Sequence, residues 1–440
     1  MRCRRVKDGS FRTDRSGDAP VLGREPASVA MDASPAMTPD RSFLKAGHLP
    51  TLFAAFLYFD LSFMVWVLLG PLGVAISRDL HLSPSQKGLM VAIPTLAGAI
   101  LRVVNGVLVD RFTPRKVGLV AQLLVMAGLA VAWVLRIHSY PAMLLLGIVL
   151  GLAGASFAVA LPLASRWYPP EHQGKALGIA GAGNSGTVLA ALFAPALAVA
   201  FGWINVVGLA ILPLGFAFLV FVFCAKDSPN RPPPKSAAAY AAVLRQGDAW
   251  WFMLFYGVSF GGFVGLASSL TIYFNDQYHL GAVHAGYCTA AVVFAGSMVR
   301  PIGGALADRV GGIRALRVMY AVACLAFAAV GFGLSSIYTA VPVLILGMLA
   351  LGMGNGAVFQ LVPQRFGNEI GVMTGVVGMC GGIGGFYLAT SLGWSRQVTG
   401  SYSDAFLIFA ALAAVAFVGL NLVGRRWHAS WAATSAVARA

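Results

Sequence analysis

The stretch of sequence that decides the fold is LRVVNGVLVDR, residues 101–111, in which Arg102 stands inside an apolar run that ends in an Asp-Arg pair. A second stretch, VRPIGGALADR at residues 299–309, repeats this arrangement around Arg300. Each arginine precedes its Asp-Arg pair by 8 residues. The two stretches indicate that the chain contains one structural unit twice.

The repeat extends well beyond these two stretches. The offset of 198 residues that relates Arg102 to Arg300 also relates Tyr58 to Tyr256. It relates three pairs of glycines as well: Gly106 and Gly304, Gly183 and Gly381, Gly186 and Gly384. A register kept over so much of the chain favours two homologous halves.

The composition is that of a membrane protein. Hydrophobic residues make up 58% of the chain, charged residues 11%, and the mean hydropathy is +0.78, whereas a soluble domain has about 25% charged residues. Apolar runs of about 20 residues are long enough to cross about 30 Å of hydrocarbon as helices. We predict an all-α polytopic membrane protein with 12 transmembrane helices, at residues 51–76, 88–109, 117–135, 141–163, 177–200, 205–225, 250–273, 283–306, 318–335, 341–361, 372–391 and 404–423.

The positive charge follows the predicted topology. The net charge is +15, but 13 of the 31 Lys and Arg residues lie in predicted inner loops and only 4 lie in outer loops. This asymmetry is the one that orients helices with their positive loops in the cytoplasm. We therefore expect a multi-pass protein of the cell (inner) membrane with both termini cytoplasmic, in contact with the lipid bilayer and not with nucleic acid.

A polar stretch divides the predicted helices into six and six. Residues 226–248 begin with KDSPNRPPPK, which is stiffened by proline. We expect this segment to be a cytoplasmic linker between six-helix bundles at residues 49–225 and 249–425. Residues 1–48 lack the apolar core of a signal peptide and are predicted to form a disordered cytoplasmic tail, with a second tail at residues 426–440. We expect a monomer.

The sequence offers no motif for catalysis. Four of the five cysteines fall in apolar spans, where a thiol behaves as a small hydrophobic group. We find no His/Cys spacing for a metal and no nucleophile–base pair in the spans. The sequence therefore predicts neither an enzyme nor a bound cofactor or metal.

Two six-helix bundles joined by a long inner loop resemble the major facilitator superfamily. The segment GVLVDRFTPRK, residues 106–116, looks like that superfamily's loop between helices 2 and 3, and residues 304–314 repeat it. An Asp at a helix end that faces arginines makes charge-assisted contacts. The resemblance implies a cytoplasmic latch between the bundles in the outward-facing state; the alternative is that these residues only set topology. The latch residues would be Asp110, Arg111, Arg115, Asp308, Arg309 and Arg314.

Four motifs in the predicted central helices resemble the nitrate/nitrite porter family. They are AGAILR at 97–102, GAGNSG at 181–186, GSMVR at 296–300 and GGIGG at 381–385. The resemblance implies nitrate import, with nitrite as a further possible substrate. It also implies that glycines allow helices to slide during transport, and these would be Gly181, Gly183, Gly186, Gly381, Gly382, Gly384 and Gly385.

The two arginines support an anion site on physical grounds. A charged side chain in a membrane helix costs at least about 2.5 kcal/mol, so it should face the interior and meet a partner. A guanidinium presents a planar fork of N–H donors, which suits a flat oxyanion. The alternative is an ion pair with a buried carboxylate, but Asp60 is the only acid well inside a predicted span.

Aromatic and amide side chains would complete the site. Tyr256 and Phe260 are four residues apart and so share a helix face. The resemblance adds Phe63 and Phe157 as residues that line the anion site. Two further candidates, Asn184 and Asn355, could donate amide hydrogens. The alternative for each aromatic residue is ordinary core or lipid packing.

The sequence leaves the energy source open. A membrane potential that is negative inside opposes nitrate import by about 2.3 kcal/mol per 100 mV. Accumulation therefore needs at least two cations per nitrate, or exchange for an anion such as nitrite. We favour a proton carried by Asp60. One alternative is that Asp60 is structural and does not titrate, and the other is that the protein is a nitrate/nitrite antiporter. A facilitator for a bulkier substrate and a non-transporting nitrate receptor are further alternatives.

Overall fold

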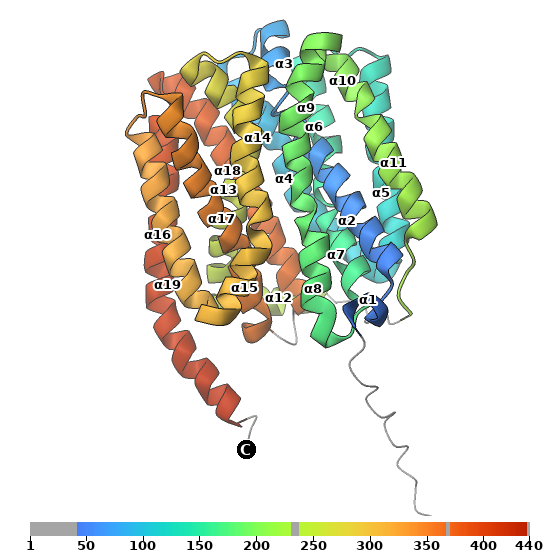
Figure 1. Cartoon of the computed structure of the whole chain (residues 1–440), viewed down its shortest axis with the longest axis vertical. Helices are drawn as coiled ribbons and strands as arrows, with labels where there is room; N and C mark the ends of the chain where they lie inside the picture. Colours follow the sequence, from blue (N-terminus) through green and yellow to red (C-terminus); the bar gives the residue numbers. More distant parts are fainter. Residues whose placement is uncertain (1–41, 230–236, 367–369, 438–440) are drawn as a thin grey trace, which may run out of the picture. The chain divides into compact units, whose positions relative to one another are not determined.

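The computed structural model describes residues 42–229, 237–366 and 370–437. Within these residues it contains helices and no strands, and twelve helical segments are long and apolar enough to cross a membrane. The predicted all-α polytopic architecture is confirmed (Figure 1). The part of the predicted N-terminal tail at residues 1–41 and the Cys3 position lie outside the described residues.

The first half of the chain contains the elements up to α11. They are α1 (Phe43–Ala46), α2 (Leu49–Trp66), α3 (Gly73–Asp79), α4 (Pro84–Arg111), α5 (Pro114–Val134), α6 (Tyr140–Gly154), α7 (Phe157–Ser165), α8 (Pro170–Gly181), the 3₁₀ turn η1 (Ala182–Ser185), α9 (Gly186–Phe201), α10 (Trp203–Leu209) and α11 (Ile211–Cys224).

The second half contains the remaining elements. They are α12 (Ala237–Leu244), α13 (Gly247–Tyr278), α14 (Ala282–Met298), α15 (Arg300–Val310), α16 (Gly312–Gly331), α17 (Ile337–Arg365), α18 (Ile370–Thr399) and α19 (Ser403–Val437). Helix α12 lies within the predicted linker, and α19 continues through the predicted C-terminal tail as far as Val437.

The first predicted tail includes an ordered segment. Helix α1 lies at residues 43–46, and the Phe43 ring stacks on Tyr168 with centroids 4.9 Å apart. The predicted disorder therefore does not extend over all of residues 1–48, because Phe43 packs against the protein just before the first membrane helix.

Five of the predicted membrane spans are interrupted, which the sequence did not predict. The spans 51–76 and 205–225 are broken at residues 67–72 and at Ala210. The span 141–163 is interrupted at Ala155 and Ser156, the span 177–200 contains η1, and the span 283–306 is interrupted at Val299. Pro301 contributes to the last break, because it has no N–H to donate to the carbonyl of the residue four positions before it, and it lies in the first turn of α15, where that N–H is not needed. Short 3₁₀ segments inside helices often mark functional positions.

Thr113 and Pro114 have a structural role in the loop before α5. Thr113 is the N-cap of α5, and its side chain accepts a hydrogen bond from the backbone N–H of Lys116. Pro114 follows as the first helical residue, where its missing N–H costs nothing. This pair of residues therefore stabilises the start of α5.

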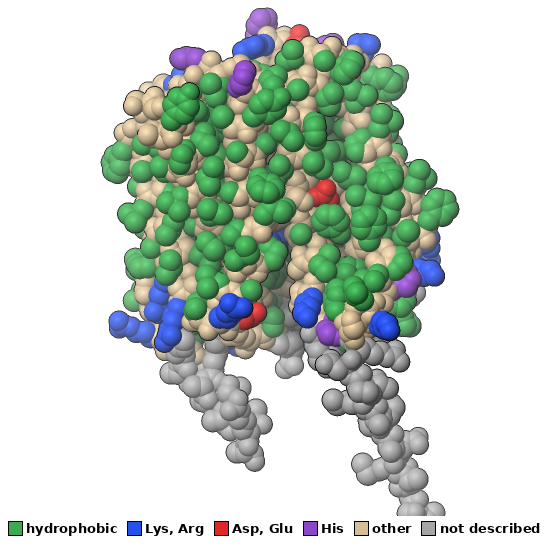
Figure 2. Space-filling view, in the orientation of Figure 1, with side chains coloured by type: hydrophobic (Ala, Val, Ile, Leu, Met, Phe, Trp, Pro, Cys, Tyr) green, Lys and Arg blue, Asp and Glu red, His purple; other side chains and the backbone are tan. Residues whose placement is uncertain are grey.

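The two halves pack closely at the predicted outer end. Helix α4 packs against α18, and a Cβ added to Gly88 would collide with the backbone of Gly393. Helix α9 likewise packs against α14, where Gly286 meets the Ala191 carbonyl. At the opposite end, where Lys and Arg side chains are most numerous, Figure 2 shows a hollow between the two halves. We therefore describe the arrangement as closed at the predicted outer end.

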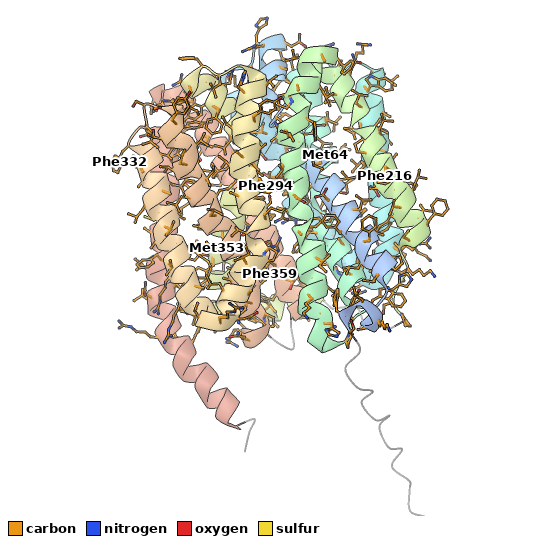
Figure 3. The ribbon with its side chains drawn as sticks, viewed as in Figure 1. Met64, Phe216, Phe294, Phe332, Met353 and Phe359 are labelled. Carbon is orange, nitrogen blue, oxygen red and sulfur yellow. The ribbon has the colours of Figure 1, made fainter. Side chains whose placement is uncertain are left out.

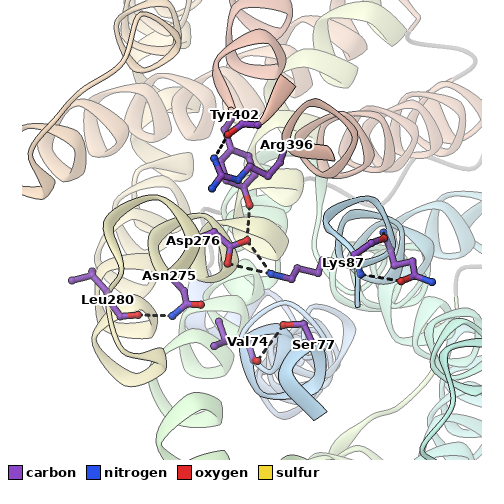
Figure 4. Close-up of polar contacts among 11 residues, drawn as sticks. Val74, Ser77, Lys87, Asn275, Asp276, Leu280, Arg396 and Tyr402 are labelled. Carbon is purple, nitrogen blue, oxygen red and sulfur yellow. Dashed lines mark hydrogen bonds and ion pairs between the residues drawn. The ribbon is translucent and has the colours of Figure 1, made fainter. Parts of the chain in front are cut away.

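An ion pair joins the halves at this closed end (Figure 4). Lys87 Nζ of α4 lies 3.2 and 3.1 Å from the two carboxylate oxygens of Asp276 on α13. The Tyr402 hydroxyl donates to the same carboxylate at 2.9 Å, and the Arg396 guanidinium lies over the Tyr402 ring. Of the ion pairs among the described residues, Lys87–Asp276 is the one that connects the two halves.

We predict that charge reversal at Lys87 opens the outer end. Lys87→Asp replaces attraction by repulsion across the interface, and should increase severalfold the reaction of a cysteine placed at Val91 with a membrane-impermeant thiol reagent. The double variant Lys87→Asp/Asp276→Lys should restore protection, because it rebuilds the pair in reverse. Arg78→Asp, at an exposed position of α3, is the control. Equal labelling of all variants would contradict a closing role for the pair.

Candidate anion-binding site

The structure brings Arg102 and Arg300 together from the two halves. Arg102 lies in the middle of α4 and is 2% exposed, and Arg300 begins α15 immediately after the break at Val299. Their guanidinium carbons lie 5.4 Å and 5.9 Å from the centroid of the same ring, that of Phe157. The break before α15 therefore determines where the Arg300 side chain projects from the span.

The Arg102 guanidinium is held by backbone carbonyls from both halves. Its Nε donates to the Gly154 carbonyl at 3.1 Å, and its Nη1 donates to the Gly378 carbonyl of α18 at 2.8 Å. Its Nη2 is buried and makes no hydrogen bond. A buried charged donor without a partner is costly, so Nη2 is a position at which an acceptor is expected.

Aromatic rings surround Arg102 and offer their faces to its charge. The guanidinium carbon lies 4.9 Å from the Phe260 centroid, 5.1 Å from Trp66 and 5.9 Å from Phe63. Trp66 is fixed by a hydrogen bond from its Nε1 to the Pro94 carbonyl at 2.8 Å. A Cβ at Gly154 would collide with the Trp66 ring, so this glycine makes room for the cluster.

Arg300 is oriented by an amide and a ring. Its Nη1 donates to Asn184 Oδ1 of η1 at 3.3 Å, and its guanidinium carbon lies 5.8 Å from the Phe359 centroid. The Tyr256 hydroxyl lies near the same guanidinium, without the geometry of a hydrogen bond. Among the residues that the structure describes, neither Arg102 nor Arg300 forms an ion pair with a carboxylate.

The predicted aromatic residues lie in one cluster. Tyr256 and Phe260 stack with centroids 5.0 Å apart and an interplanar angle of 5°. Phe63 lies 6.4 Å from Phe260, and Phe157 contacts both arginines. All four rings are buried inside the protein and do not face lipid.

Sequence analysis missed Phe359 and Trp66. The Phe359 ring meets Tyr256 edge-on at 4.9 Å and lies 6.0 Å from Phe157. Figure 3 shows Phe359 between the two halves, whereas Phe216 and Phe332 lie at the periphery. Helical spacing carried the signal, because Phe359 follows Asn355 by four residues and Trp66 follows Phe63 by three.

Two asparagines add unused donors to the site. Asn184 and Asn355 are both fully buried. The Asn184 Nδ2 atom has no partner, and neither do the two side-chain polar atoms of Asn355. The repeat offset of 198 relates Asn355 to Phe157, so the two halves offer different chemistry at equivalent positions. Together with Arg102 Nη2 and the Tyr256 hydroxyl, the Asn184 amide forms a set of N–H and O–H donors suited to a small oxyanion. The place of Asn355 in this set stays a prediction.

The predicted glycines lie at close helix contacts. Gly183 and Gly186 pack on α2, and Gly381 lies under the stacked Tyr256 and Phe260 rings, where a Cβ would collide with both. The remaining glycines also meet other helices: Gly181 faces Arg300, Gly382 meets Ala99, Gly384 meets Gly257 and Gly385 meets Val264. Their role in sliding stays a prediction.

The structure places Asp60 beside the arginine cluster and not within it. Its carboxylate lies 2.6 Å from Ser185 Oγ. Among the described residues, it forms no hydrogen bond or ion pair with Arg102 or Arg300. The neighbouring Phe59 and Phe63 form the face of α2 that meets the site. Asp60 therefore contacts η1, which also carries Asn184.

The predicted latch residues do not connect the halves in this arrangement. Asp110 pairs with Arg166 at 3.0 Å, and both belong to the first half. Arg115 donates through Nη2 to the Val222 carbonyl, and its backbone N–H donates to Asp227. Asp308, Arg309 and Arg314 make no ion pair among the described residues. A latch of the outward-facing state stays a prediction, since these halves meet at the other end.

The unpaired donors predict stabilisation by small planar oxyanions. An anion that binds only the folded protein at 100 times its Kd adds about 2.7 kcal/mol to the free energy of unfolding. Nitrate or nitrite should therefore raise the Tm of the purified protein in a concentration-dependent way, and gluconate at equal ionic strength should not. An equal shift with gluconate would show a general salt effect and contradict the site.

Comparisons with known proteins agree with this geometry. The family model of the Major Facilitator Superfamily matches residues 52–389. A solved bacterial homologue of the human lysosomal transporter Spinster, in an inward-facing and unoccupied conformation, superimposes with a TM-score of 0.67 at 16% identity. The match covers 85% of this chain and 96% of that chain. It shows the major facilitator fold.

Curated relatives narrow the family. The chain is 32% identical to the "Nitrite extrusion protein" of Bacillus subtilis over 81% of this chain and 89% of the relative. It is 33% identical to the "Probable nitrate/nitrite transporter NarK2" of Mycobacterium tuberculosis, over 81% and 91%. It is 30% identical to the "Probable nitrate/nitrite antiporter NarK1" of Thermus thermophilus, over 85% and 91%. With the superfamily match over most of its length, the chain belongs to the nitrate/nitrite porter family of the major facilitator superfamily.

Proposed function

We propose that this protein transports nitrate, and also nitrite, across the cell membrane by alternating access, and that it acts as a nitrate importer. The observation that carries the proposal is the pair of arginines, one from each half, that flank Phe157 without a carboxylate partner among the described residues. The names of the relatives support the choice of anion.

The geometry suits a small flat anion better than a bulky one. Arg102 is enclosed by four aromatic rings, and Gly381 lies against two of the rings that bound the site. Nitrate offers three acceptor oxygens to the free Arg102 Nη2, to Arg300 and to the amides of Asn184 and Asn355. Because the rings exclude water, each hydrogen bond to the anion acts in a medium of low dielectric constant.

Binding in this position links the two halves. Arg102 belongs to α4 and Arg300 to α15, so one anion that contacts both guanidiniums draws the halves together at their centre. The halves are in contact at the predicted outer end and separated at the other end (Figure 2). An exchange of these two contacts about a central site is the alternating access that we propose for this chain.

We further propose that a proton on Asp60 accompanies nitrate import. Asp60 lies in the span α2 and bonds to η1, whose Asn184 contacts Arg300. Nitrate/nitrite exchange is the second candidate, and the absence of a carboxylate contact to the arginines in the described residues favours it. The relatives named as an antiporter and as an extrusion protein favour it as well.

The remaining parts of the proposal concern the protein's placement. Both termini lie in the cytoplasm, the protein is a monomer, and it performs transport without catalysis or a cofactor. The distribution of Lys and Arg supports this orientation.

Replacing either arginine by lysine tests the clamp. Arg102→Lys and Arg300→Lys each keep the charge but lose the planar fork, so uptake of labelled nitrate into proteoliposomes should fall at least about tenfold, the effect of one lost hydrogen bond to a charged group. Arg78→Lys, at an exposed position of α3, should transport normally. Near-normal uptake by either central variant, at equal protein incorporation, would count against a nitrate clamp.

Asp60→Asn separates proton coupling from exchange. The amide fills the same space without titrating, so the variant should lose accumulation driven by a pH gradient yet keep nitrate–nitrate counterflow. Asp404→Asn, at an exposed position of α19, is the matched control. Accumulation driven by the pH gradient in Asp60→Asn at the wild-type level would refute the proton carrier. Uptake that depends only on internal nitrite would then establish exchange.

A further inference from the structure

Asp60 is attached to the irregular turn of the fifth membrane span. Its Oδ1 atom accepts a hydrogen bond from the Ser185 hydroxyl at 2.6 Å. A Cβ at Gly186 would collide with the Asp60 carbonyl, and one at Gly183 would meet the Asp60 backbone nitrogen. The backbones of α2 and η1 therefore touch at Asp60, with no side chain between them to absorb a movement.

The Ser185 hydroxyl has two possible acceptors and one hydrogen. Its Oγ lies 2.6 Å from Asp60 Oδ1 and 2.9 Å from the Ala182 carbonyl oxygen. When Asp60 is ionised, the Ser185 hydrogen is drawn to the carboxylate, and the Ala182 carbonyl loses it. When Asp60 is protonated, the carboxyl group donates to Ser185 Oγ, and Ser185 can donate to Ala182. The state of Asp60 therefore decides whether the Ser185 hydroxyl adds a hydrogen bond to the Ala182 carbonyl across the η1 turn.

The same turn carries the residue that orients Arg300. Asn184 precedes Ser185, and its Oδ1 accepts from Arg300 Nη1 at 3.3 Å. The Asn184 carbonyl accepts from Thr187 and lies 3.5 Å from Ser297 Oγ of α14. A rearrangement at Ser185 thus acts one residue away from the contact between the first half and Arg300 of the second.

We propose that Ser185 is a positioning residue that couples the proton on Asp60 to the anion clamp, by switching its hydroxyl between Asp60 and the Ala182 carbonyl and so setting the placement of Asn184 on Arg300. The inference rests on the proposed proton-coupled nitrate transport. The proton stays on Asp60 while nitrate is bound in the central site, and it leaves to the cytoplasm after the anion does. No bond other than hydrogen bonds and the carboxyl O–H changes.

No other charged group competes for Asp60 among the described residues. Helices α7 and α9 and the turn η1 carry no titratable side chain. Helix α6 carries Tyr140 at its outer end, α11 carries Cys224 at its inner end, and α8 carries Glu171, His172 and Lys175 in its first turns. Lys175 precedes Ser185 by 10 residues, a helical rise of roughly 15 Å. On the other side of η1, Arg300 donates a hydrogen bond to Asn184.

The test measures nitrate affinity against pH in purified protein. Because linkage is reciprocal, a proton that favours nitrate makes nitrate bind more tightly at low pH. We expect the nitrate Kd of the wild type to rise about tenfold as the pH increases through the titration of Asp60, within the usual range of such coupling. Ser185→Ala should lose most of this dependence, and Ser185→Thr, which keeps a hydroxyl, should retain it. A purely structural serine would weaken binding equally at every pH.

A matched control is available in α18. The Ser391 hydroxyl donates to the Leu388 carbonyl at 2.9 Å, with the same three-residue spacing as Ser185 and Ala182 but without a hydrogen bond to a carboxylate. Ser391→Ala should leave the pH profile unchanged. Should Ser185→Ala not be recovered in folded form, Ser185→Cys supplies a weak donor in the same position, and its profile should be flattened as well.

Each outcome separates the hypotheses. A flat profile in Asp60→Asn with an unchanged profile in Ser185→Ala would overturn the role of Ser185 and leave proton coupling intact. A wild-type profile in Asp60→Asn would overturn Asp60 as the carrier and the inference with it. If wild-type protein bound no nitrate at any pH, the proposed function itself would fail.

Discussion

Arg102 is buried and Arg300 partly buried, and neither has an acidic partner among the described residues; this is the constraint on which the rest of the structure depends. A charge in this position costs several kcal/mol unless other groups solvate it. Backbone carbonyls of Gly154 and Gly378 and the faces of aromatic rings do so for Arg102, and Asn184 does so for Arg300. This solvation is incomplete, because donors remain free. These unpaired donors are the groups that would bind a small anion.

The helix breaks are a second expression of this constraint. Carbonyl and amide groups in regular helices are consumed by the helices themselves. The interruptions at Ala155–Ser156, at η1 and at Val299 occur where Phe157, Asn184 and Arg300 reach the site. Irregular backbone at membrane depth is tolerated where it surrounds a cavity or is buried in protein. The broken spans therefore belong to the site as much as the side chains do.

Hydropathy and the internal repeat predicted the twelve spans and the two arginines, because both depend on residue type alone. The family resemblance supplied Phe63 and Phe157, and helical spacing supplied Tyr256 with Phe260. The same spacing was not applied to Phe359. The carbonyl of Gly378 and the contact of Asp60 with Ser185 could not be predicted, because they depend on how distant helices are placed and not on which residues the helices carry. The helical continuation of α19 beyond the predicted span was not predicted, since hydropathy was used only to find the membrane-spanning part of each helix.

The ion pair at the closed end makes the contact between the two halves sensitive to the salt concentration of the medium. Lys87 and Asp276 are 18% and 16% exposed in their side chains, so dissolved ions reach them from the medium. The Debye length falls from about 30 Å at 0.01 M salt to about 3 Å at 1 M. Salt in the medium therefore weakens the attraction that closes the predicted outer end, but by less than it would weaken a fully exposed pair. Ionic strength is thus one influence on the balance between the two orientations before any substrate is bound.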